Sequence, residues 1–333
     1  MKGLGYNLGE RTRAVLLASL ISLAAIIVIL RFTDAGISWR EITHIDARYL
    51  LLGLALHVLS WILYSIRLRL LAALAGHSIS LRLSIRSTLA SNFLAALTPS
   101  SVGGEPLRIK ILAEDGMSYG SATAVAVGER LLDCLFFIGA LAFFLIFSGL
   151  FTGFGLRIGA VFLVLLFLIL AFLAELVARP ERIEGLMAWA KRRSGERPIV
   201  LFIEREVWLF REASIQLARA TFRRMPLMVA LTAMIWMADF LVPSALLVGM
   251  GAEANLLRSV TAQIILAIVA VLPLTPGGSG VAELTMSYLY SMFVSPALLG
   301  PVVALWRLIT YFSNIAVGAA FAGASLNSMM KKD

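Results

Sequence analysis

The sequence has little charge, a single cysteine and three histidines, and each shortage excludes a class of protein. Only 15% of its 333 residues are charged, whereas soluble domains have about 25%. This excludes an ordinary water-soluble enzyme, a disordered chain and a coiled coil. The lone Cys134 excludes a disulfide framework and a thiolate zinc site. The histidines lack the spacing of metal ligands. We therefore expect neither a metal nor a cofactor.

Apolar residues are abundant instead. They make up 60% of the chain, and the mean hydropathy is +0.90. These values predict an integral membrane protein, with residues 1–333 forming one transmembrane domain. The net charge of +9 suits the positive-inside rule and anionic headgroups better than nucleic acid, which we do not expect as a partner.

Long apolar runs predict an all-α, polytopic fold with about six full spans. The expected spans are about residues 15–32, 49–71, 118–150, 156–177, 226–250 and 296–326. The charged residues Glu129, Arg130 and Asp133 lie within the third span, Asp239 within the fifth and Arg307 within the sixth.

Two further apolar stretches, 84–97 and 261–274, are too short to span a membrane. Each leads into Thr-Pro, a glycine-rich turn and a second short helical run. This pattern is typical of a broken, re-entrant helix pair, because clustered glycines allow a true chain reversal. The alternative is one proline-kinked crossing helix in each case.

Basic residues indicate the orientation. If both broken helices return to their own side, 22 of the 29 basic residues, Arg67 and Arg108 among them, lie on the side of the N-terminus and five lie opposite. This bias places both termini in the cytoplasm, with the protein in the cell (inner or plasma) membrane. Residues 179–224 form the only sizeable extramembrane segment. Apolar residues at helical spacing there, from Ile199 to Leu217, predict an amphipathic helix on the cytoplasmic leaflet.

The two halves repeat at a constant offset of 177 residues. The matching pairs are Thr98-Pro99 with Thr275-Pro276, Gly103 with Gly280, Ser118 with Ser295, and Arg130-Leu131 with Arg307-Leu308; Glu105 recurs one residue late as Glu283. Repeat one covers about 47–150 and repeat two about 224–327. Three crossings separate the equivalent spans, so the repeat is inverted, with the two Pro-Gly tips meeting near the midplane as in alternating-access transporters.

The charged residues of the repeats suggest a site. A helix start after each tip presents free N–H groups and a positive dipole end, which suits an anion; a break used only for packing is the alternative. Arg130 and Arg307 need partners in an apolar environment, and Glu105 and Glu283 are the natural ones. These pairs are either structural bridges or sites where an anionic headgroup meets the guanidinium.

The candidate site residues follow from the tips and the buried charges. The substrate-binding candidates are Asn92, Thr98, Ser101, Gly103, Gly104, Glu105, Arg108, Arg130, Thr275, Gly277, Gly278, Ser279, Gly280, Glu283 and Arg307. The proton-coupling candidates are Glu129, Asp133 and Asp239, although satisfied structural acids are equally plausible. The sequence contains no P-loop, no G-x-S-x-G and no H-E-x-x-H motif. We expect no catalytic residues and no enzyme activity.

These motifs resemble a known family. Asn92, Thr98-Pro99, Gly104-Glu105-Pro106-Leu107-Arg108 and Glu129-Arg130-Leu131-Leu132-Asp133 look like the first half of the lysylphosphatidylglycerol synthase transmembrane region, also called the flippase-like domain. Pro273-x-Thr275-Pro276-Gly277-Gly278-x-Gly280-Val281-x-Glu283 with Arg307 looks like the second half. The resemblance implies a lipid translocase. The chain ends soon after its last span, so we expect a stand-alone member without the aminoacyl-transferase domain of some relatives.

Repeat, charges and resemblance together predict a flippase-like translocase that moves an anionic phospholipid or polyprenyl-phosphate-type lipid between leaflets by alternating access. The alternatives are an ion-coupled carrier of a small soluble anion, and a non-catalytic membrane subunit of a lipid synthase. The expected partners are membrane lipids, with a homo-oligomer or a lipid-synthesis enzyme also compatible with the sequence.

Overall fold

The computed structural model describes residues 45–98, 103–148, 152–194, 197–270, 275 and 277–330, and these form helices and turns without any strand. Five helical segments within them are long and apolar enough to cross a membrane. They are α3 (Ala47–Leu74), α6 (Tyr119–Ser148), α7 (Thr152–Ala178), α10 (Met225–Phe240) with α11 (Val242–Gly249), and α14 (Pro296–Arg307) with η1 (Leu308–Phe312) and α15 (Ser313–Met330). The all-α, polytopic membrane architecture is confirmed. The first expected span, 15–32, lies outside the described residues.

Local irregularities interrupt two of these segments. Pro243 lies in the first turn of α11, where a backbone N–H has no helical acceptor, so its missing N–H removes no helical hydrogen bond. The preceding helix α10 ends just before it. The last segment changes to a π-helix, η1, immediately after Arg307. Single π-turns inside helices are frequently found at functional sites.

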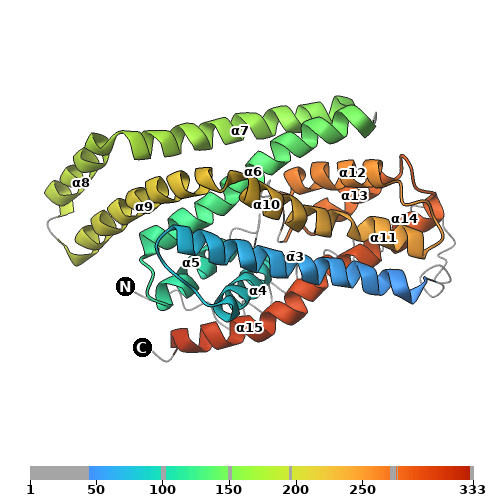
Figure 1. The fold of residues 1–333 in the computed structure, drawn as a ribbon, viewed down its shortest axis with the longest axis horizontal. Helices are drawn as coiled ribbons and strands as arrows, with labels where there is room; N and C mark the ends of the chain where they lie inside the picture. The colour runs from blue at the N-terminus through green and yellow to red at the C-terminus, as the bar shows by residue number, and fades with distance from the viewer. Residues whose placement is uncertain are drawn as a thin grey trace.

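The two short apolar stretches form broken helix pairs. The first pair is α4 (Leu81–Leu97) and α5 (Gly104–Glu114), and the second is α12 (Leu256–Val269) and α13 (Val281–Tyr290). At Gly104 an added Cβ would lie 2.9 Å from the carbonyl oxygen of Ser91 on α4. The chain has therefore turned back onto α4, and this pair is not one continuous kinked helix. Figure 1 shows the two pairs in opposite halves of the molecule.

The two breaks touch each other. The backbone N–H of Gly277 donates to the carbonyl oxygen of Thr98, with N and O 3.0 Å apart. Gly277 has a φ of +56°, and a Cβ there would overlap the carbonyl oxygen of Ala96. Only glycine combines this backbone conformation with so close an approach. The predicted meeting of the tips is thus present in the structure.

Residues 180–223 form two helices, α8 (Pro180–Ser194) and α9 (Pro198–Arg223). Part of the expected apolar stripe of α9 packs on protein: Phe210 and Leu217 are buried, while Ile199 and Ile203 are exposed. Gly120 at the start of α6 allows α9 to approach closely, and its N–H donates to the Glu206 carboxylate at 2.7 Å. Half of the stripe is therefore covered by α6 rather than left for a membrane surface.

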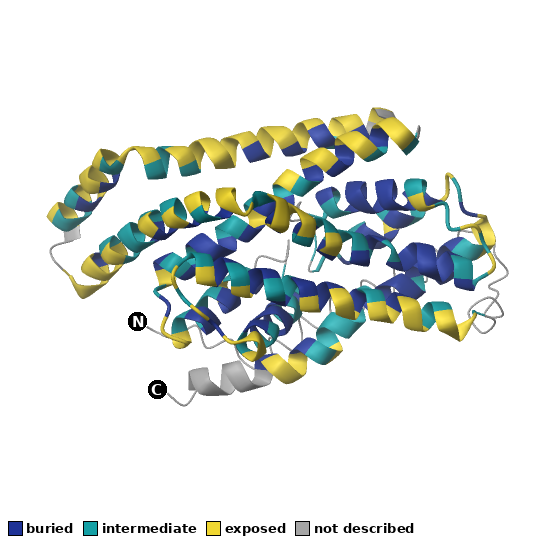
Figure 2. Cartoon of the chain, in the orientation of Figure 1, coloured by how far each residue is buried: buried dark blue, intermediate teal, exposed yellow. Residues whose placement is uncertain are grey.

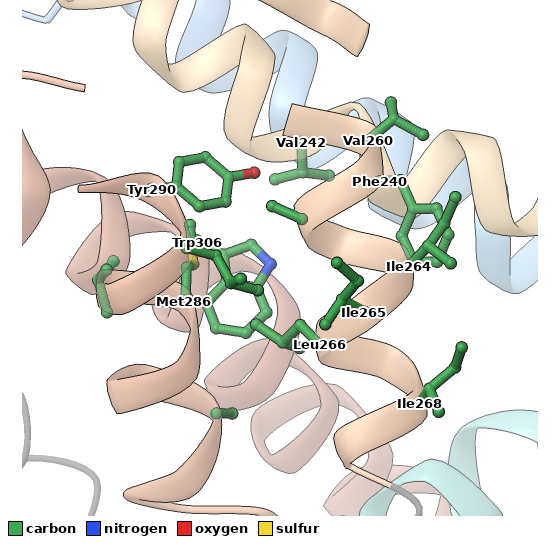
Figure 3. Packing of buried hydrophobic residues seen from close by; sticks show 14 of the residues in the cluster. Phe240, Val242, Val260, Ile264, Ile265, Leu266, Ile268, Met286, Tyr290 and Trp306 are labelled. Carbon is green, nitrogen blue, oxygen red and sulfur yellow. The ribbon is translucent and has the colours of Figure 1, made fainter. Parts of the chain in front are cut away.

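The largest apolar core is formed mainly by the second half of the chain, and α6 and α7 add side chains such as Phe137 and Phe162 to it. It joins α10, α11, α12, α13 and α14 through side chains such as Phe240, Ile264, Met286 and Trp306 (Figure 3). Tyr290, also in this core, places its hydroxyl 2.7 Å from that of Ser259. By contrast α7 is exposed along most of its length (Figure 2). An apolar helix with so little protein contact is a helix that faces lipid.

Candidate functional site

A cavity of about 700 Å³ lies where the first broken pair, α3, α10 and the α14–α15 segment converge. Eight of the predicted site residues line it: Asn92, Gly104, Glu105, Arg108, Arg130, Asp239, Gly277 and Arg307. The remaining described candidates, Thr98, Gly103, Glu129, Asp133, Thr275, Gly278, Ser279, Gly280 and Glu283, do not line it. Ser101 lies outside the described residues.

Six charged side chains beside the cavity, three of which line it, form a closed ring of alternating sign. We call them the charge ring: Glu105, Arg108, Glu129, Arg67, Asp133 and Arg130, in that order. The closest nitrogen–oxygen distances around it are 3.4 Å, 2.7 Å, 3.8 Å, 2.7 Å, 3.2 Å and 3.0 Å, the last closing the ring from Arg130 to Glu105. Each charge has two neighbours of opposite sign, so the ring is neutral and offsets the desolvation of its members.

Tyr64 lies at the centre of the charge ring. The guanidinium groups of Arg67, Arg108 and Arg130 lie 4.7 Å, 5.0 Å and 5.9 Å from the centre of its aromatic ring. Arg130 also donates to the Tyr64 hydroxyl. An electron-rich aromatic face stabilises cations around it, and this arrangement fixes the orientation of the three arginines.

One edge of the charge ring is open. The side chains of Arg130 and Glu105 are 46% and 31% exposed, whereas the other four are at most 4% exposed. The expected Arg130–Glu105 pair is present at this open edge. Because Arg130 also contacts Asp133, its guanidinium stays oriented even when Glu105 is displaced. This edge is where an incoming anion can reach a buried network.

The second expected pair is also present but sealed. Arg307 Nε lies 2.8 Å from Glu283 Oε1, and both side chains are almost fully buried. The other carboxylate oxygen of Glu283 accepts the backbone N–H of Gly280 at 2.7 Å. Glu283 thereby caps the start of α13, as a glutamate at the third helical position does.

The one-residue shift in the repeat accounts for this difference between the halves. Glu283 follows Gly280 by three residues and reaches back to its N–H. Glu105 follows Gly103 by only two residues, and the Gly103 N–H instead donates to the Thr98 hydroxyl at 2.9 Å. Glu105 therefore remains available at the cavity. At each tip we expected free backbone N–H groups for an anion. The N–H of Gly103 and the N–H of Gly280 instead each have an acceptor within the chain.

Arg307 nevertheless borders the cavity. Its guanidinium lies 4.5 Å from the centre of the Tyr311 ring, and its Nη2 is buried without a hydrogen-bond partner among the described residues. Arg307 thus belongs to the wall of the cavity from the second half of the chain, although its Nη2 is itself covered by protein.

Asp239 has a partner that the sequence did not reveal. Its carboxylate lies 2.7 Å from Nδ1 of His57 on α3, and it remains 29% exposed. Nearby, Trp236 donates to Asp133 at 3.0 Å, which connects α10 to the charge ring. Of the three proton-coupling candidates, Asp239 alone borders the cavity, while Glu129 and Asp133 are bound within the ring.

Arg67 and Arg108 are among the basic residues that the orientation count assigns to the cytoplasmic side. The structure buries both side chains in the charge ring. Arg67 lies inside α3, seven residues before its end. A signal was available: Ser60, Tyr64 and Arg67 recur at helical spacing along an apolar span, which indicates a polar stripe facing the protein interior.

Sequence reasoning also missed Asn314. Its side-chain oxygen accepts from the Trp61 indole at 3.0 Å and from Asn92 at 3.3 Å. Asn92 was a substrate-binding candidate, and here it joins α4 to α15. Asn92 also lines the cavity. The same residue therefore joins two helices and forms part of the cavity wall.

The charge ring predicts a large stability effect at Arg67. Replacing Arg67 with alanine leaves Glu129 and Asp133 buried beside too few cations, and we expect a loss of about 3–5 kcal/mol in unfolding free energy. Arg69→Ala is the matched control, since Arg69 is exposed two residues away on α3. Thermal unfolding in detergent measures both variants. Equal melting temperatures for the two would show that the ring contributes nothing to the fold.

The fold and the cavity define a multi-pass α-helical membrane protein with a network of buried charges at its centre. The chain belongs to the family described as the lysylphosphatidylglycerol synthase transmembrane region, whose model matches residues 15–318. It is 38% identical over 313 residues to a UPF0104 membrane protein of Archaeoglobus fulgidus, covering 92% of this chain and 95% of that one. UPF0104 membrane proteins of Pyrococcus horikoshii and Methanothermobacter thermautotrophicus are each 23% identical, over 90% and 95% of this chain and 93% and 97% of their own lengths.

Proposed function

We propose that the protein translocates an anionic lipid, a phospholipid or a polyprenyl-phosphate-type lipid, between the two leaflets. One observation carries this proposal. Glu105, Ile109 and Arg130 line both the charged cavity and a second, apolar groove of about 570 Å³ between α5, α6 and α7. A polar site for a headgroup thus adjoins an apolar site that borders the lipid-facing helix α7. This combination suits an amphiphile.

A small soluble anion would use only half of this arrangement. It would occupy the cavity beside Arg130 and Arg307 and leave the apolar groove without a role. A carrier of such an anion also benefits from a cavity sealed from lipid. The adjacency of cavity and groove, which share three lining residues, therefore favours the lipid over the soluble anion.

The proposed architecture is six spans and two re-entrant pairs in an inverted repeat, with repeat one at about 47–150 and repeat two at about 224–327. The constant offset of 177 residues, the Gly277–Thr98 contact and the opposite positions of the two broken pairs in Figure 1 support it. Leaving out Arg67 and Arg108 reduces the count of cytoplasmic basic residues from 22 to 20, still against five. Both termini therefore stay assigned to the cytoplasm.

The open edge of the charge ring supports a mechanism of exchange. A phosphate oxygen pair can replace the Glu105 carboxylate at Arg130, since a guanidinium binds either group through two parallel hydrogen bonds. Arg307 adds a second positive charge to the cavity wall from the other half of the chain. A headgroup that contacts both halves can stabilise their closure around it, which is the requirement for alternating access.

The test is transport in reconstituted liposomes. Headgroup-labelled phosphatidylglycerol is followed by dithionite quenching, with empty liposomes and a headgroup-labelled neutral glycolipid as references. We expect the anionic lipid to cross faster than in empty liposomes, and an excess of soluble glycerol phosphate to leave its rate unchanged. Transport no faster than in empty liposomes contradicts the proposal. Uptake of labelled glycerol phosphate without lipid transport would support the soluble-anion carrier instead.

Proton coupling is proposed for Asp239, because it borders the cavity and pairs with His57. The other charged groups facing this cavity are Glu105, Arg108, Arg130 and Arg307. In Asp239→Asn, the amide cannot exchange a proton in the pH range of the assay. We expect this variant to keep transport without a gradient and to lose any acceleration by an imposed pH gradient. Unchanged acceleration would remove Asp239 from the mechanism.

A further inference from the structure

We propose that the apolar groove between α6 and α7 holds a hydrocarbon chain of the lipid while its headgroup lies in the cavity. This inference rests on the proposed function and adds to it a path for the tail. The groove is defined by the side chains that line it: Glu105, Ile109, Thr123, Ala126, Val127, Arg130, Leu131, Cys134, Leu166, Leu168, Ile169, Phe172 and Leu173. Its charged members, Glu105 and Arg130, are the ones it shares with the cavity.

The packing of α7 explains why a groove exists on this side. Near the start of α7, Gly155 and Gly159 let the helix lie directly on α6. Added Cβ atoms there would be 2.6 Å and 2.8 Å from Leu145 and Leu141. Further along α7, Phe210 of α9 packs between α6 and α7. It contacts the cluster that contains Ala124 of α6 and Leu173 of α7, and so keeps α6 and α7 apart. Figure 1 shows α6 and α7 close at one end and diverging toward the other.

The groove continues beyond the headgroup site. A second apolar cavity of about 690 Å³ lies between α6, α7 and α9 and shares Val127, Leu131 and Leu173 with the groove. Together they extend from the open edge of the charge ring along α6 to α9. Two adjoining apolar cavities, the first of which begins at a cationic side chain, match the polarity of an anionic lipid.

The chemistry of the lining favours a hydrocarbon over a peptide. The hydroxyl of Thr123, the polar uncharged group in the groove, already donates to the Tyr119 carbonyl at 2.7 Å. A peptide would bring backbone amides that find no partner along this wall, each at a cost of several kcal/mol in a lipid environment. A hydrocarbon chain brings no such groups and fills the space by dispersion contacts.

A matched pair of tryptophan variants on α7 tests the inference. Leu173 lines both the groove and its continuation, whereas Val164 is 60% exposed on the same helix and lines neither. We expect Leu173→Trp to lower the rate of phosphatidylglycerol transport by about tenfold by overfilling the groove. Val164→Trp should stay near the wild-type rate, because Val164 lines neither cavity. Equal rates for the two tryptophan variants would overturn the tail path.

Two controls separate this inference from the proposed function. Wild-type protein that moves no lipid contradicts the translocase itself, whereas a translocase that is insensitive to Leu173→Trp contradicts only the tail path. If Leu173→Trp does not fold, a phosphatidylglycerol with a diazirine in its acyl chain replaces it as the probe. Cross-links on wild-type protein should map to residues 126–134 more than to the exposed α7 residues Val161, Val164 and Leu165, which line neither cavity. Equal yields at both places would also overturn the tail path.

Discussion

Replacing Arg130 with glutamine should lower the rate of anionic lipid transport by about 100-fold. The expected loss takes the lower end of about 1.5–3 kcal/mol for each of two charge-assisted hydrogen bonds, that is about 3 kcal/mol, or roughly 100-fold in rate. Arg130 is the cation at the open edge of the charge ring, where cavity and groove join. Arg130→Lys keeps the charge but loses the paired geometry, so it should retain only part of the rate.

The matched control for Arg130 is Arg157→Gln on α7. Arg157 is exposed and has no place in the cavity or the groove, so its loss should leave transport near the wild-type rate. Thermal unfolding of the variants separates loss of transport from loss of fold. A folded Arg130→Gln protein that transports lipid at the wild-type rate would remove Arg130 from the headgroup site.

The contact between the two tips predicts the second large effect. Both Gly277 and Gly278 have positive φ, at +56° and +67°, so alanine is strained at either position. An added Cβ overlaps the backbone of the other tip at Gly277, but at Gly278 it has nothing within 4 Å. Gly277→Ala should therefore destabilise the protein by about 1–3 kcal/mol more than Gly278→Ala, as overpacking does.

Comparing Gly277→Ala with Gly278→Ala separates the cost of backbone strain from the cost of the steric overlap with Ala96. The strain itself costs about 1–2 kcal/mol at each position. Melting temperatures in detergent and lipid transport are measured for both variants. We expect Gly277→Ala to lose transport as well as stability, because the two halves can no longer meet at Thr98. Identical behaviour of the two variants would show that the Gly277–Thr98 contact is incidental.

Much of the fold could be predicted because a bilayer leaves few choices. Apolar length located every described span, and glycines after Thr-Pro located both breaks. The partners of Arg130 and Arg307 could also be predicted, since a guanidinium in an apolar run needs a carboxylate and each repeat offers one close to its tip. These inferences depend on local sequence and on the cost of burying charge.

The charge ring could not be predicted in the same way. At Arg67, near the end of an apolar run, the positive-inside rule and the rule for buried charges give opposite interpretations. Arg108 pairs with Glu129 on another helix, α6, and the sequence predicts the reversal after α4 but not which helix α5 then faces. The His57–Asp239 pair joins residues 182 positions apart, a separation at which neither spacing nor periodicity carries information.

The difference between the two halves illustrates the same limit. By sequence, Glu105 and Glu283 are equivalent members of a repeat. The one-residue shift makes Glu283 a helix cap and leaves Glu105 facing the cavity. Two sequence-related Glu–Arg pairs can thus differ, one being a buried structural pair and the other accessible from the cavity. Substitutions at Glu105 and Glu283 are therefore not expected to have the same effects.

The most direct test of the account is an experimental structure of the protein in nanodiscs that contain an anionic lipid. We predict density for a headgroup between Arg130 and Arg307, continuous with a chain that leaves between α6 and α7 past Leu173. Such density would show that one lipid occupies the cavity, contacts the open edge of the charge ring and extends into the groove. A cavity that holds no lipid and is closed off from the groove by protein side chains would contradict the account.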